Sequence, residues 1–313
     1  MQRHKIRVFG SLNADLVQQV PRIPERGETL RGGDLRIYAG GKGANQACAA
    51  ALLGAEVEMA GQVGSDVFAD RLRAELNRCG VDTSLVEASA KPSGTATIFV
   101  LPDGENLIVL SPGANAENSV EFAGRAAAAL GVGDFLLCQL EIPLESVHAA
   151  ISAAAANGVS TVLDPAPAYP LPEALLKGVT ILTPNQTEAR LLLQWTEPID
   201  TILQAEQAAT ALQALGPRIV IVKMGNQGCV IAEPGAVTHI PGFAVTVADT
   251  TAAGDTFNGA LAAGLAENMA LKEAARFANA AAALSVTKPG AISSMPSRME
   301  VYPLLEKIHV HRP

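Results

Sequence analysis

Residues 249–260 read Asp249-Thr-Thr-Ala-Ala-Gly-Asp255-Thr-Phe-Asn-Gly-Ala260, and they decide how the whole chain is interpreted. A β-branched run from Val245 to Val247 precedes them, and an apolar pattern of helical period extends from Thr256 to Leu265. The pattern predicts an extended segment that leads through small residues into a helix, with Asp255 in the first helical turn. Extended segments joined to helices in this way are typical of α/β folds.

The predicted helix start has the properties of an anion-binding site. Backbone N–H groups at the start of a helix have no partners within it, and the helix dipole adds partial positive charge there. The small residues Ala252, Ala253 and Gly254 leave room for a phosphate beside these groups. A carboxylate at Asp255 would repel that phosphate unless it faces another group, such as a substrate hydroxyl whose proton it accepts. This combination indicates phosphoryl transfer.

Asp255 also has a simpler interpretation. An acidic residue in the first turn stabilises many helices through the dipole, by about 0.3–1 kcal/mol, without any catalytic role. The residue type alone does not separate the two interpretations, so other parts of the chain have to decide between them.

Short apolar strands alternate with alanine-rich helical stretches along most of the chain. The expected strands cover residues 6–9, 57–61, 135–140, 161–164, 179–183 and 219–222. The expected helices cover residues 44–53, 69–78, 120–130, 144–156, 187–193, 205–215, 256–266 and 271–286. Such alternation is typical of βαβ units around a parallel sheet. We therefore expect an α/β fold, and no low-complexity linker divides residues 1–313 into separate domains.

Two segments break this alternation, at residues 14–38 and 93–111. Both are rich in residues that favour strands, contain turn sequences such as Pro-Asp-Gly-Glu, and lack a helical pattern. We expect them to pair as a small separate sheet inserted in the single domain. Beside a substrate pocket this sheet would act as a lid, and its exposed face or edge would also suit the interface of a homodimer.

The composition excludes several classes of protein. Hydrophobic residues make up 49% of the chain, enough for a large core, and the net charge is -8. An acidic chain without basic runs argues against binding to nucleic acid or to a membrane surface. No segment has the apolar length of a membrane span and the N-terminal residues lack a signal-peptide pattern, so we expect a cytoplasmic protein. The cysteine and histidine spacings do not indicate a zinc enzyme.

A second group of polar residues lies near the N-terminus. The sequence Gly10-Ser-Leu-Asn-Ala-Asp15 follows the first expected strand, and Gly40-Gly-Lys-Gly-Ala-Asn-Gln46 leads into the first expected helix. Ligands of α/β sheets bind beyond the carboxyl ends of the strands, where Asn13 and Asp15 would face a polyol. The glycines let the backbone approach a ligand closely, although a glycine-rich turn taken alone is more often structural.

Neither of the common nucleotide-binding motifs is present. A Walker A loop needs Ser or Thr after its Lys, but Gly43 follows Lys42. A dinucleotide site needs G-x-G-x-x-G after the first strand, and the sequence from Phe9 to Asn13 does not supply it. Any nucleotide must therefore be bound in another way.

The two glycine-containing motifs together resemble the two signature sequences of the ribokinase-like (PfkB) carbohydrate kinases. Residues 40–47 are similar to the first signature and residues 249–260 to the second. Further similar blocks lie at residues 10–15, 139–141, 164–168, 183–188 and 277–281, so the resemblance covers nearly the whole chain. It implies a three-layer α/β/α sandwich with a central, mostly parallel sheet and a small β-sheet lid.

The resemblance also implies an activity and the residues that perform it. The implied reaction is ATP-dependent phosphorylation of D-ribose at O5, with Asp255 as general base and the backbone of Ala252, Ala253 and Gly254 as anion hole. Besides Asp255, the residues implied for the ribose hydroxyls are Asn13, Asp15, Gly41, Lys42, Asn45 and Glu141. Each of them is polar or is glycine, as direct contact with a sugar requires.

The nucleotide and its ions have implied positions as well. The residues implied for ATP are Asn185, Glu188, Lys223, Gly225, Gly228, Gly254 and Asn279. Glu188 would organise Mg²⁺ through water, which suits an ion that readily retains its water molecules. The residues implied for a monovalent cation, K⁺, are Asp249, Thr251, Ser285, Lys288, Gly290 and Ser294, mostly through backbone carbonyls.

Local structure offers alternatives for several of these residues. Asn185 and Glu188 follow a Thr-Pro pair in the pattern of a helix capping box. Gly225 to Gly228 also fits a turn between two strands, and Asp164 fits a residue that stabilises its own turn. Asp164 stands where the family commonly has Asn, and Asn279 stands where some members have His, which bears on the adenine contacts.

Other functions stay open at this point. Kinases of the same fold acting on deoxyribose, another furanose or a nucleoside differ by few pocket contacts. Asn13 discriminates between them, because an apolar residue there would tolerate a missing hydroxyl. A non-catalytic sugar-binding sensor is the alternative from another class, and the presence of Asp255 together with the anion-hole sequence disfavours it.

Overall fold

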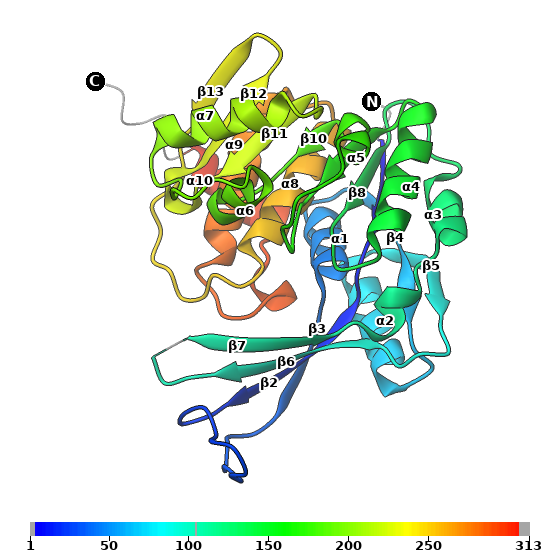
Figure 1. Cartoon of the computed structure of the whole chain (residues 1–313), viewed down its shortest axis with the longest axis vertical. Coiled ribbons are helices and arrows are strands. Elements are labelled where there is room, and N and C mark those ends of the chain that lie inside the picture. The colour runs from blue at the N-terminus through cyan, green and yellow to red at the C-terminus, as the bar shows by residue number, and fades with distance from the viewer. Residues whose placement is uncertain (1–3, 104, 307–313) are drawn as a thin grey trace.

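The computed structural model of the chain describes residues 4–103 and 105–306, and a nine-stranded sheet forms its centre (Figure 1). The strands are β1 (Lys5–Phe9), β4 (Glu56–Val63), β5 (Asp82–Ala88), β8 (Phe135–Cys138), β9 (Ser160–Leu163), β10 (Ile181–Leu182), β11 (Ile219–Lys223), β12 (Cys229–Glu233) and β13 (Ala236–Ile240). Their order is β13-β12-β11-β10-β9-β8-β1-β4-β5. The pairs from β11 to β5 are parallel, whereas β12 and β13 are antiparallel.

Helices cover both faces of this sheet, and each face has its own hydrophobic core. One layer contains α1 (Lys42–Leu52), α2 (Val67–Cys79), α8 (Ala253–Ala266), α9 (Leu271–Ser285) and α10 (Arg298–Glu306). The other contains α3 (Val120–Ala127), α4 (Leu144–Ala156), α5 (Glu173–Lys177), α6 (Gln186–Leu192) and α7 (Ile202–Gln213). The predicted three-layer sandwich is therefore confirmed. Within the described ranges, none of these helices is long and apolar enough to span a membrane.

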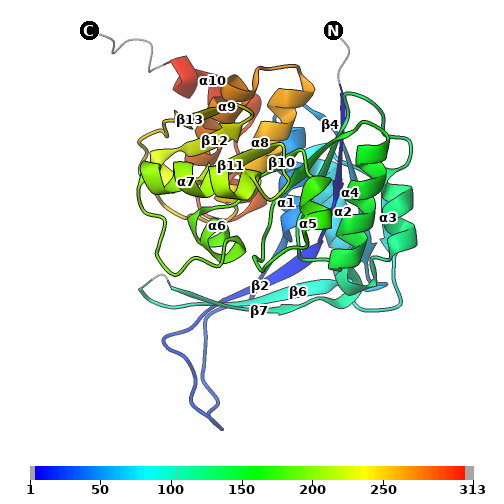
Figure 2. The same ribbon diagram turned by 45° about the horizontal axis from the view of Figure 1, so that its top comes forward.

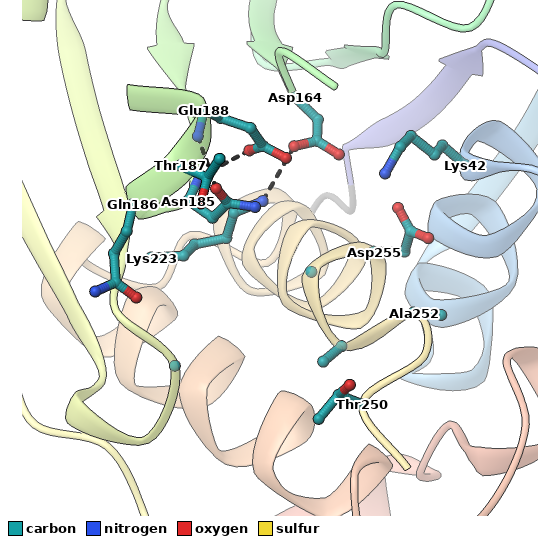
Figure 3. Close-up of a pocket in the computed structure, with 13 residues that line it drawn as sticks. Lys42, Asp164, Asn185, Gln186, Thr187, Glu188, Lys223, Thr250, Ala252 and Asp255 are labelled. Atoms are coloured by element: carbon teal, nitrogen blue, oxygen red, sulfur yellow. Dashed lines mark hydrogen bonds and ion pairs between the residues drawn. The ribbon is translucent and has the colours of Figure 1, made fainter. Parts of the chain in front are cut away.

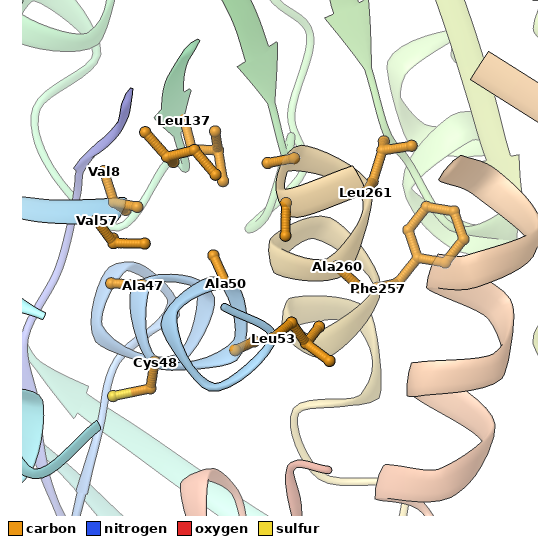
Figure 4. Packing of buried hydrophobic residues seen from close by; sticks show 14 of the residues in the cluster. Val8, Ala47, Cys48, Ala50, Leu53, Val57, Leu137, Phe257, Ala260 and Leu261 are labelled. Carbon is orange, nitrogen blue, oxygen red and sulfur yellow. The ribbon is translucent and has the colours of Figure 1, made fainter. Parts of the chain in front are cut away.

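Helices α1 and α8 pack closely against each other because small residues line their contact (Figure 4). Ala47, Ala50 and Ala260 are fully buried between them and the sheet. A Cβ atom added at Gly259 would lie 2.6 Å from the Cβ of Ala49. This close packing fixes the relative position of the two helix starts, where the glycine-rich motifs of the sequence lie.

The two segments predicted as an inserted sheet form a second, four-stranded sheet beside the main body (Figures 1 and 2). Its strands are β2 (Asn13–Gln19), β3 (Arg36–Gly40), β6 (Gly94–Val100) and β7 (Asn106–Ser111), in the order β3-β2-β6-β7. All residues of β7 are exposed, including Ile108 and Val109. Residues 20–35 between β2 and β3 contain no strand.

Some elements differ from the sequence-based expectation. Helix α8 begins at Ala253, earlier than predicted, because Ala252 adopts a left-handed conformation (φ 56°) that turns the chain into the helix. Strand β10 is shorter than predicted and contains only Ile181 and Leu182. Strand β5 and helices α5 and α10 were not expected: α5 has only 5 residues and α10 contains Pro303, so neither has a clear helical pattern.

Candidate active site

Most of the predicted site residues lie at the carboxyl ends of the parallel strands, where α1 and α8 begin. Ligands of α/β sheets bind at this edge. A cavity of about 440 Å³ opens there (Figure 3). It is lined by Lys42, Asp164, Asn185, Gln186, Thr187, Glu188, Lys223, Gly225, Thr250, Ala252, Ala253, Gly254 and Asp255. The fold thus brings together residues predicted to bind sugar, phosphate and magnesium.

Asp255 lies in the first turn of α8, as predicted, with only 5% of its surface exposed. Asn45 donates a hydrogen bond from Nδ2 to Oδ2 of Asp255 at 2.9 Å, and Gln46 donates one from Nε2 to Oδ1 at 3.1 Å. Burial raises the pKa of Asp255, while the ammonium group of Lys42 opposes the shift. The result is an oriented carboxylate whose affinity for a proton is increased, which is the property a general base needs.

The predicted anion hole lies at the start of the same helix. Among the described residues, the amides of Ala252 and Gly254 have no hydrogen-bond acceptor, whereas the amide of Ala253 donates to the carbonyl of Thr250 at 3.3 Å. All three residues line the cavity. Gly254 also lies close to Lys223, whose Nζ would be 3.4 Å from a Cβ added at Gly254. Free amides and an ammonium group therefore face the same space, as phosphate binding requires.

Several of the predicted sugar ligands contact one another around the start of α1. Gly41 has φ 89°, and a Cβ there would lie 2.8 Å from the amide nitrogen of Asn13, so only glycine fits this position. Glu141 accepts hydrogen bonds at Oε2 from the hydroxyl of Ser11 (2.6 Å) and from the amide of Lys42 (3.2 Å). Oδ1 of Asn45 is buried without a partner among the described residues. An unpaired buried acceptor of this kind fits a sugar hydroxyl.

Asp15 is a sugar-site carboxylate whose pKa is also raised. Burial, followed by the nearby charges of Glu141 and Asp255, raises the pKa of Asp15 to about 7. Lys42 shows the opposite balance: burial alone would lower its pKa, but the surrounding carboxylates, foremost Asp255 and Asp164, raise it. Lys42 therefore stays charged at neutral pH, whereas Asp15 gains or loses its proton close to neutral pH.

Asn115 is a site residue that the sequence interpretation missed. Its Nδ2 donates to Oδ1 of Asn13 at 2.7 Å, and its Oδ1 accepts the amide of Leu12 at 2.9 Å. Because the side-chain oxygen of Asn13 is engaged in this way, the NH₂ group of Asn13 is left to donate to a ligand. Asn115 follows the inserted sheet in a segment without a recognisable motif, so no signal in the sequence pointed to it.

Asp164 and Lys223 form an ion pair at the floor of the cavity (Figure 3). Lys223 Nζ and Asp164 Oδ1 are 3.0 Å apart, and the two side chains are 12% and 3% exposed. Asp164 follows β9 and Lys223 ends β11, so the pair connects two strand ends. The interpretation of Asp164 as a turn residue alone is therefore incomplete, because the residue is part of the site.

A second cavity of about 610 Å³ adjoins the first and contains the residues predicted for the adenine side of ATP. Lys223, Gly225 and Gly254 line both cavities. Gly228 has φ 92°, and a Cβ there would lie 2.1 Å from the carbonyl oxygen of Ile240. Gly225 to Gly228 form the turn between the antiparallel strands β11 and β12, so the turn and the cavity wall are the same segment.

Asn279 lines this second cavity, but its NH₂ group is already occupied. Nδ2 of Asn279 donates to the carbonyls of Ile240 at 3.2 Å and Pro241 at 3.3 Å. The side-chain oxygen of Asn279 is the atom left for a ligand. The residue thus anchors the cavity wall in addition to bordering the cavity.

Asn185 and Glu188 form the capping box that their spacing indicated, at the start of α6. Oδ1 of Asn185 accepts the amide of Glu188 at 2.8 Å, and Oε2 of Glu188 accepts the amide of Asn185 at 2.7 Å. Oε1 of Glu188 makes no hydrogen bond within the described ranges. Burial raises the pKa of Glu188, and the positive charge of Lys223 opposes this effect. Oε1 of Glu188, which lines the first cavity, thus stays available, and this fits water-mediated binding of Mg²⁺.

Asp249 joins two of the segments predicted to hold a monovalent cation. Its Oδ1 accepts hydrogen bonds from the amide (2.9 Å) and the hydroxyl (2.6 Å) of Thr251, and its Oδ2 accepts one from the amide of Gly290 at 2.8 Å. This ties the loop that enters α8 to the loop after α9. Asp249 thus connects two of the segments that the resemblance implied for the cation.

Three other predicted cation ligands have side chains engaged in contacts within the protein. The hydroxyls of Ser285 and Ser294 donate to carbonyls of their own turns, and Nζ of Lys288 forms an ion pair with Glu300 at 2.9 Å. Contacts of these residues with a cation could use backbone carbonyls or the lone pairs that the two hydroxyl oxygens keep.

Comparison with known proteins adds an independent line of evidence. Residues 3–298 match the model of the pfkB family carbohydrate kinases. The chain is 43% identical to a ribokinase of Haemophilus influenzae (97% of this chain, 99% of the relative) and 41% identical to one of Bacillus subtilis (96% and 99%). The structure of an Arabidopsis thaliana ribokinase complexed with ribose and ATP is similar, with a TM-score of 0.87 and 34% identity over 98% of this chain and 99% of that one. The chain therefore belongs to the pfkB family of carbohydrate kinases.

Proposed function

We propose that the protein catalyses the ribokinase reaction: it transfers the γ-phosphoryl group of ATP to O5 of D-ribose and forms ribose 5-phosphate and ADP. The observation that carries this proposal is the position of Asp255. Its buried carboxylate accepts a hydrogen bond from Asn45, one of the proposed sugar ligands, and belongs to the same helix start as the free amides of Ala252 and Gly254. Relatives that match over nearly the whole length and are named ribokinases support ribose as the sugar.

In the proposed mechanism, Asp255 accepts the proton of the ribose O5 hydroxyl as O5 attacks the γ-phosphorus. A new O5–P bond forms, the bond between the γ-phosphorus and the bridging oxygen breaks, and ADP leaves with the electron pair of that bond. The amides of Ala252 and Gly254 and the ammonium group of Lys223 stabilise the negative charge on the transferred group. Asp255 then releases the proton to solvent. Positioning and charge stabilisation supply most of the rate.

Two ions complete the proposal. Mg²⁺, when bound with ATP, neutralises phosphate charge, and Asn185 and Glu188 would hold it through water. K⁺ would bind carbonyls of the loops joined by Asp249 and add positive charge behind the anion hole. Neither ion replaces Asp255 as the base. The position of Gly290, held directly by Asp249, supports the cation site.

Product identification tests the proposed reaction. Incubation with ribose and Mg-ATP, followed by phosphorus and proton NMR of the product, is expected to place the phosphorus on O5, coupled to the two hydrogens on C5. A phosphate on O1, or hydrolysis of ATP without a sugar phosphate, would overturn the assignment. The same reaction run with potassium or with an organic cation in its place measures the contribution of K⁺.

Replacing Asn13 tests the selection of ribose against deoxyribose. In Asn13→Leu an apolar side chain of similar size replaces the NH₂ donor that Asn115 orients. We expect kcat/KM for ribose to fall by about 10²-fold or more, because a sugar hydroxyl loses its partner in a buried site. The value for 2-deoxyribose should change much less. Steady-state kinetics with both sugars gives the ratio, and an equal fall for both would contradict this role of Asn13.

The pKa of Asp15 predicts how ribose binding depends on pH. Because this pKa is raised to about 7, Asp15 is mostly protonated below that pH in the free protein. Its ionised carboxylate accepts stronger hydrogen bonds from sugar hydroxyls than the protonated acid does, so ribose affinity should rise with pH through about 7 and then level off. Calorimetric titration of the protein with ribose, at pH values from about 5.5 to about 8.5 in steps of about half a unit, measures this affinity. In Asp15→Asn the affinity should be weak and independent of pH.

The small sheet supports a further part of the proposal, a homodimer formed through the lid. Strand β7 exposes a row of apolar residues, Leu107, Ile108, Val109 and Leu110. Such a row on a separate sheet suits burial against a second copy. Light scattering should give twice the mass of the chain, and Ile108→Lys with Val109→Glu should shift the protein to the monomer. A wild-type monomer would contradict this arrangement.

A further inference from the structure

Gln46 is a buried side chain that connects the two carboxylates of the site. It lies on α1 with 1% of its surface exposed. Its Nε2 donates to Oδ2 of Asp164 at 2.9 Å and to Oδ1 of Asp255 at 3.1 Å. A side-chain amide has two N–H hydrogens, so one is available for each carboxylate. Since Asn45 holds the other oxygen of Asp255, Gln46 supplies the second of the two bonds that orient this carboxylate.

Gln139 binds the amide oxygen of Gln46 and so adds to the two carboxylates that bind its nitrogen. Nε2 of Gln139, at the end of β8, donates to Oε1 of Gln46 at 2.8 Å. If the Gln46 amide were rotated by half a turn, its oxygen would face the two carboxylates and both hydrogen bonds would become repulsive. Gly10 leaves the space that Gln139 needs, because a Cβ there would lie 2.0 Å from Oε1 of Gln139. The absence of a side chain at Gly10, just after β1, thus makes room for the buried amide of Gln139.

The far end of this chain of contacts is anchored by a charge. Asp164 accepts from Gln46 with one oxygen and pairs with Lys223 through the other, at 3.0 Å. The hydrogen bonds therefore run from Gln139 through Gln46 to Asp255, with a branch to the ion pair. Neither Gln46 nor Gln139 is among the proposed ligands of the sugar or the nucleotide.

We propose that Gln46 and Gln139 are positioning residues for phosphoryl transfer: Gln139 fixes the orientation of Gln46, and Gln46 holds Asp255 toward the sugar by tying it to the Asp164–Lys223 pair. This inference rests on the proposed function. It requires that the two amides act on kcat through Asp255, and that Gln139 acts through Gln46.

The test is a set of kinetic measurements on Gln46→Met, Gln139→Met and the double variant. In Gln46→Met, kcat should fall about 10- to 100-fold while KM for ribose changes little, because the base is misplaced but the sugar ligands remain. Gln139→Met should give a smaller fall of the same kind. The double variant should be no slower than Gln46→Met, since Gln139 has nothing left to orient.

The pH profile of kcat separates this role from a merely structural one. The charged groups that act on Asp255 include Lys42, Asp164 and Asp15, and all three stay in the variants. Gln46 lowers the pKa of Asp255 by donating to its ionised form, so its loss should move the acid limb of the kcat profile upward by about one pH unit. Gln139→Met should move the limb in the same direction, by less.

Gln62→Met is the matched control, because Gln62 is a half-buried glutamine on β4 outside the site. It should keep the kcat and the pH profile of the wild type. An unchanged kcat in Gln46→Met, or losses that multiply in the double variant, would overturn the inference. If Gln46→Met does not fold, the test rests on Gln139→Met alone. A normal kcat and an unshifted acid limb in Gln139→Met would exclude an effect of Gln139 on Asp255 through Gln46. The proposed function would still stand if the positioning role failed, provided that the wild type phosphorylates ribose and Asp255→Asn does not.

Discussion

Asp255→Asn should lower kcat for ribose phosphorylation by about 10³-fold or more, because the amide cannot accept the O5 proton. Ribose affinity should change little, since the amide is of the same size and still offers an oxygen. The remaining activity reflects the anion hole and the sugar ligands. Stopped or coupled assays of ADP formation, paired with calorimetric titration of ribose, measure the two quantities on one preparation.

Asp70→Asn makes the same chemical change outside the site, since Asp70 lies exposed in the first turn of α2. It should leave both quantities unchanged. If Asp255→Asn retained wild-type turnover with bound ribose, Asp255 would not be the base, and the simpler view of it as a helix-stabilising residue would be correct.

Gly259→Ala should destabilise the protein strongly and reduce its activity. The added methyl would lie 2.6 Å from the Cβ of Ala49 and 2.7 Å from the carbonyl oxygen of Gln46, so α1 and α8 must separate. Overpacking of this kind costs about 1–3 kcal/mol, and occasionally more when backbone is displaced. Separation of the helices also moves Asp255 away from Asn45. Chemical denaturation should show a lower midpoint, and kcat should fall.

Gly124→Ala is the matched control for this variant. Gly124 lies within α3, exposed, and a Cβ there meets nothing within 4 Å. Alanine favours a helix by about 0.5–1 kcal/mol over glycine, so this variant should be slightly more stable than the wild type and equally active. A Gly259→Ala protein as stable as the wild type would mean that the contact between the two helices is looser than the structure has it.

The parts of the fold that could be predicted from sequence are those coded by neighbouring residues. Asp255 in the first turn of α8 follows from the change from small residues to a helical pattern, and the Asn185–Glu188 capping box follows from spacing alone. The inserted sheet could also be predicted, because its strand and turn patterns, without a helix, interrupt the alternation of strands and helices. By contrast, α10 was missed since Pro303 breaks its pattern.

The contacts that orient the site could not be predicted, because they join residues far apart in sequence. Asn115 reaches Asn13, and Gln139 reaches Gln46, only once the strand ends lie side by side. An asparagine or glutamine has no pattern that distinguishes such a role from an exposed position. Asp164 attracted notice as a departure from the family, but its partner Lys223 becomes evident only in the folded chain.

The central claim is tested most directly by the turnover of a sugar panel with Mg-ATP, followed by coupled detection of ADP. The panel contains ribose, 2-deoxyribose, fructose and ribonucleosides, each with and without potassium. We expect that kcat/KM is highest for ribose, that potassium raises it, and that 2-deoxyribose is used far less well. Turnover confined to another sugar or to a nucleoside would contradict the assignment of ribose, and the absence of ADP formation with every compound would contradict the kinase itself.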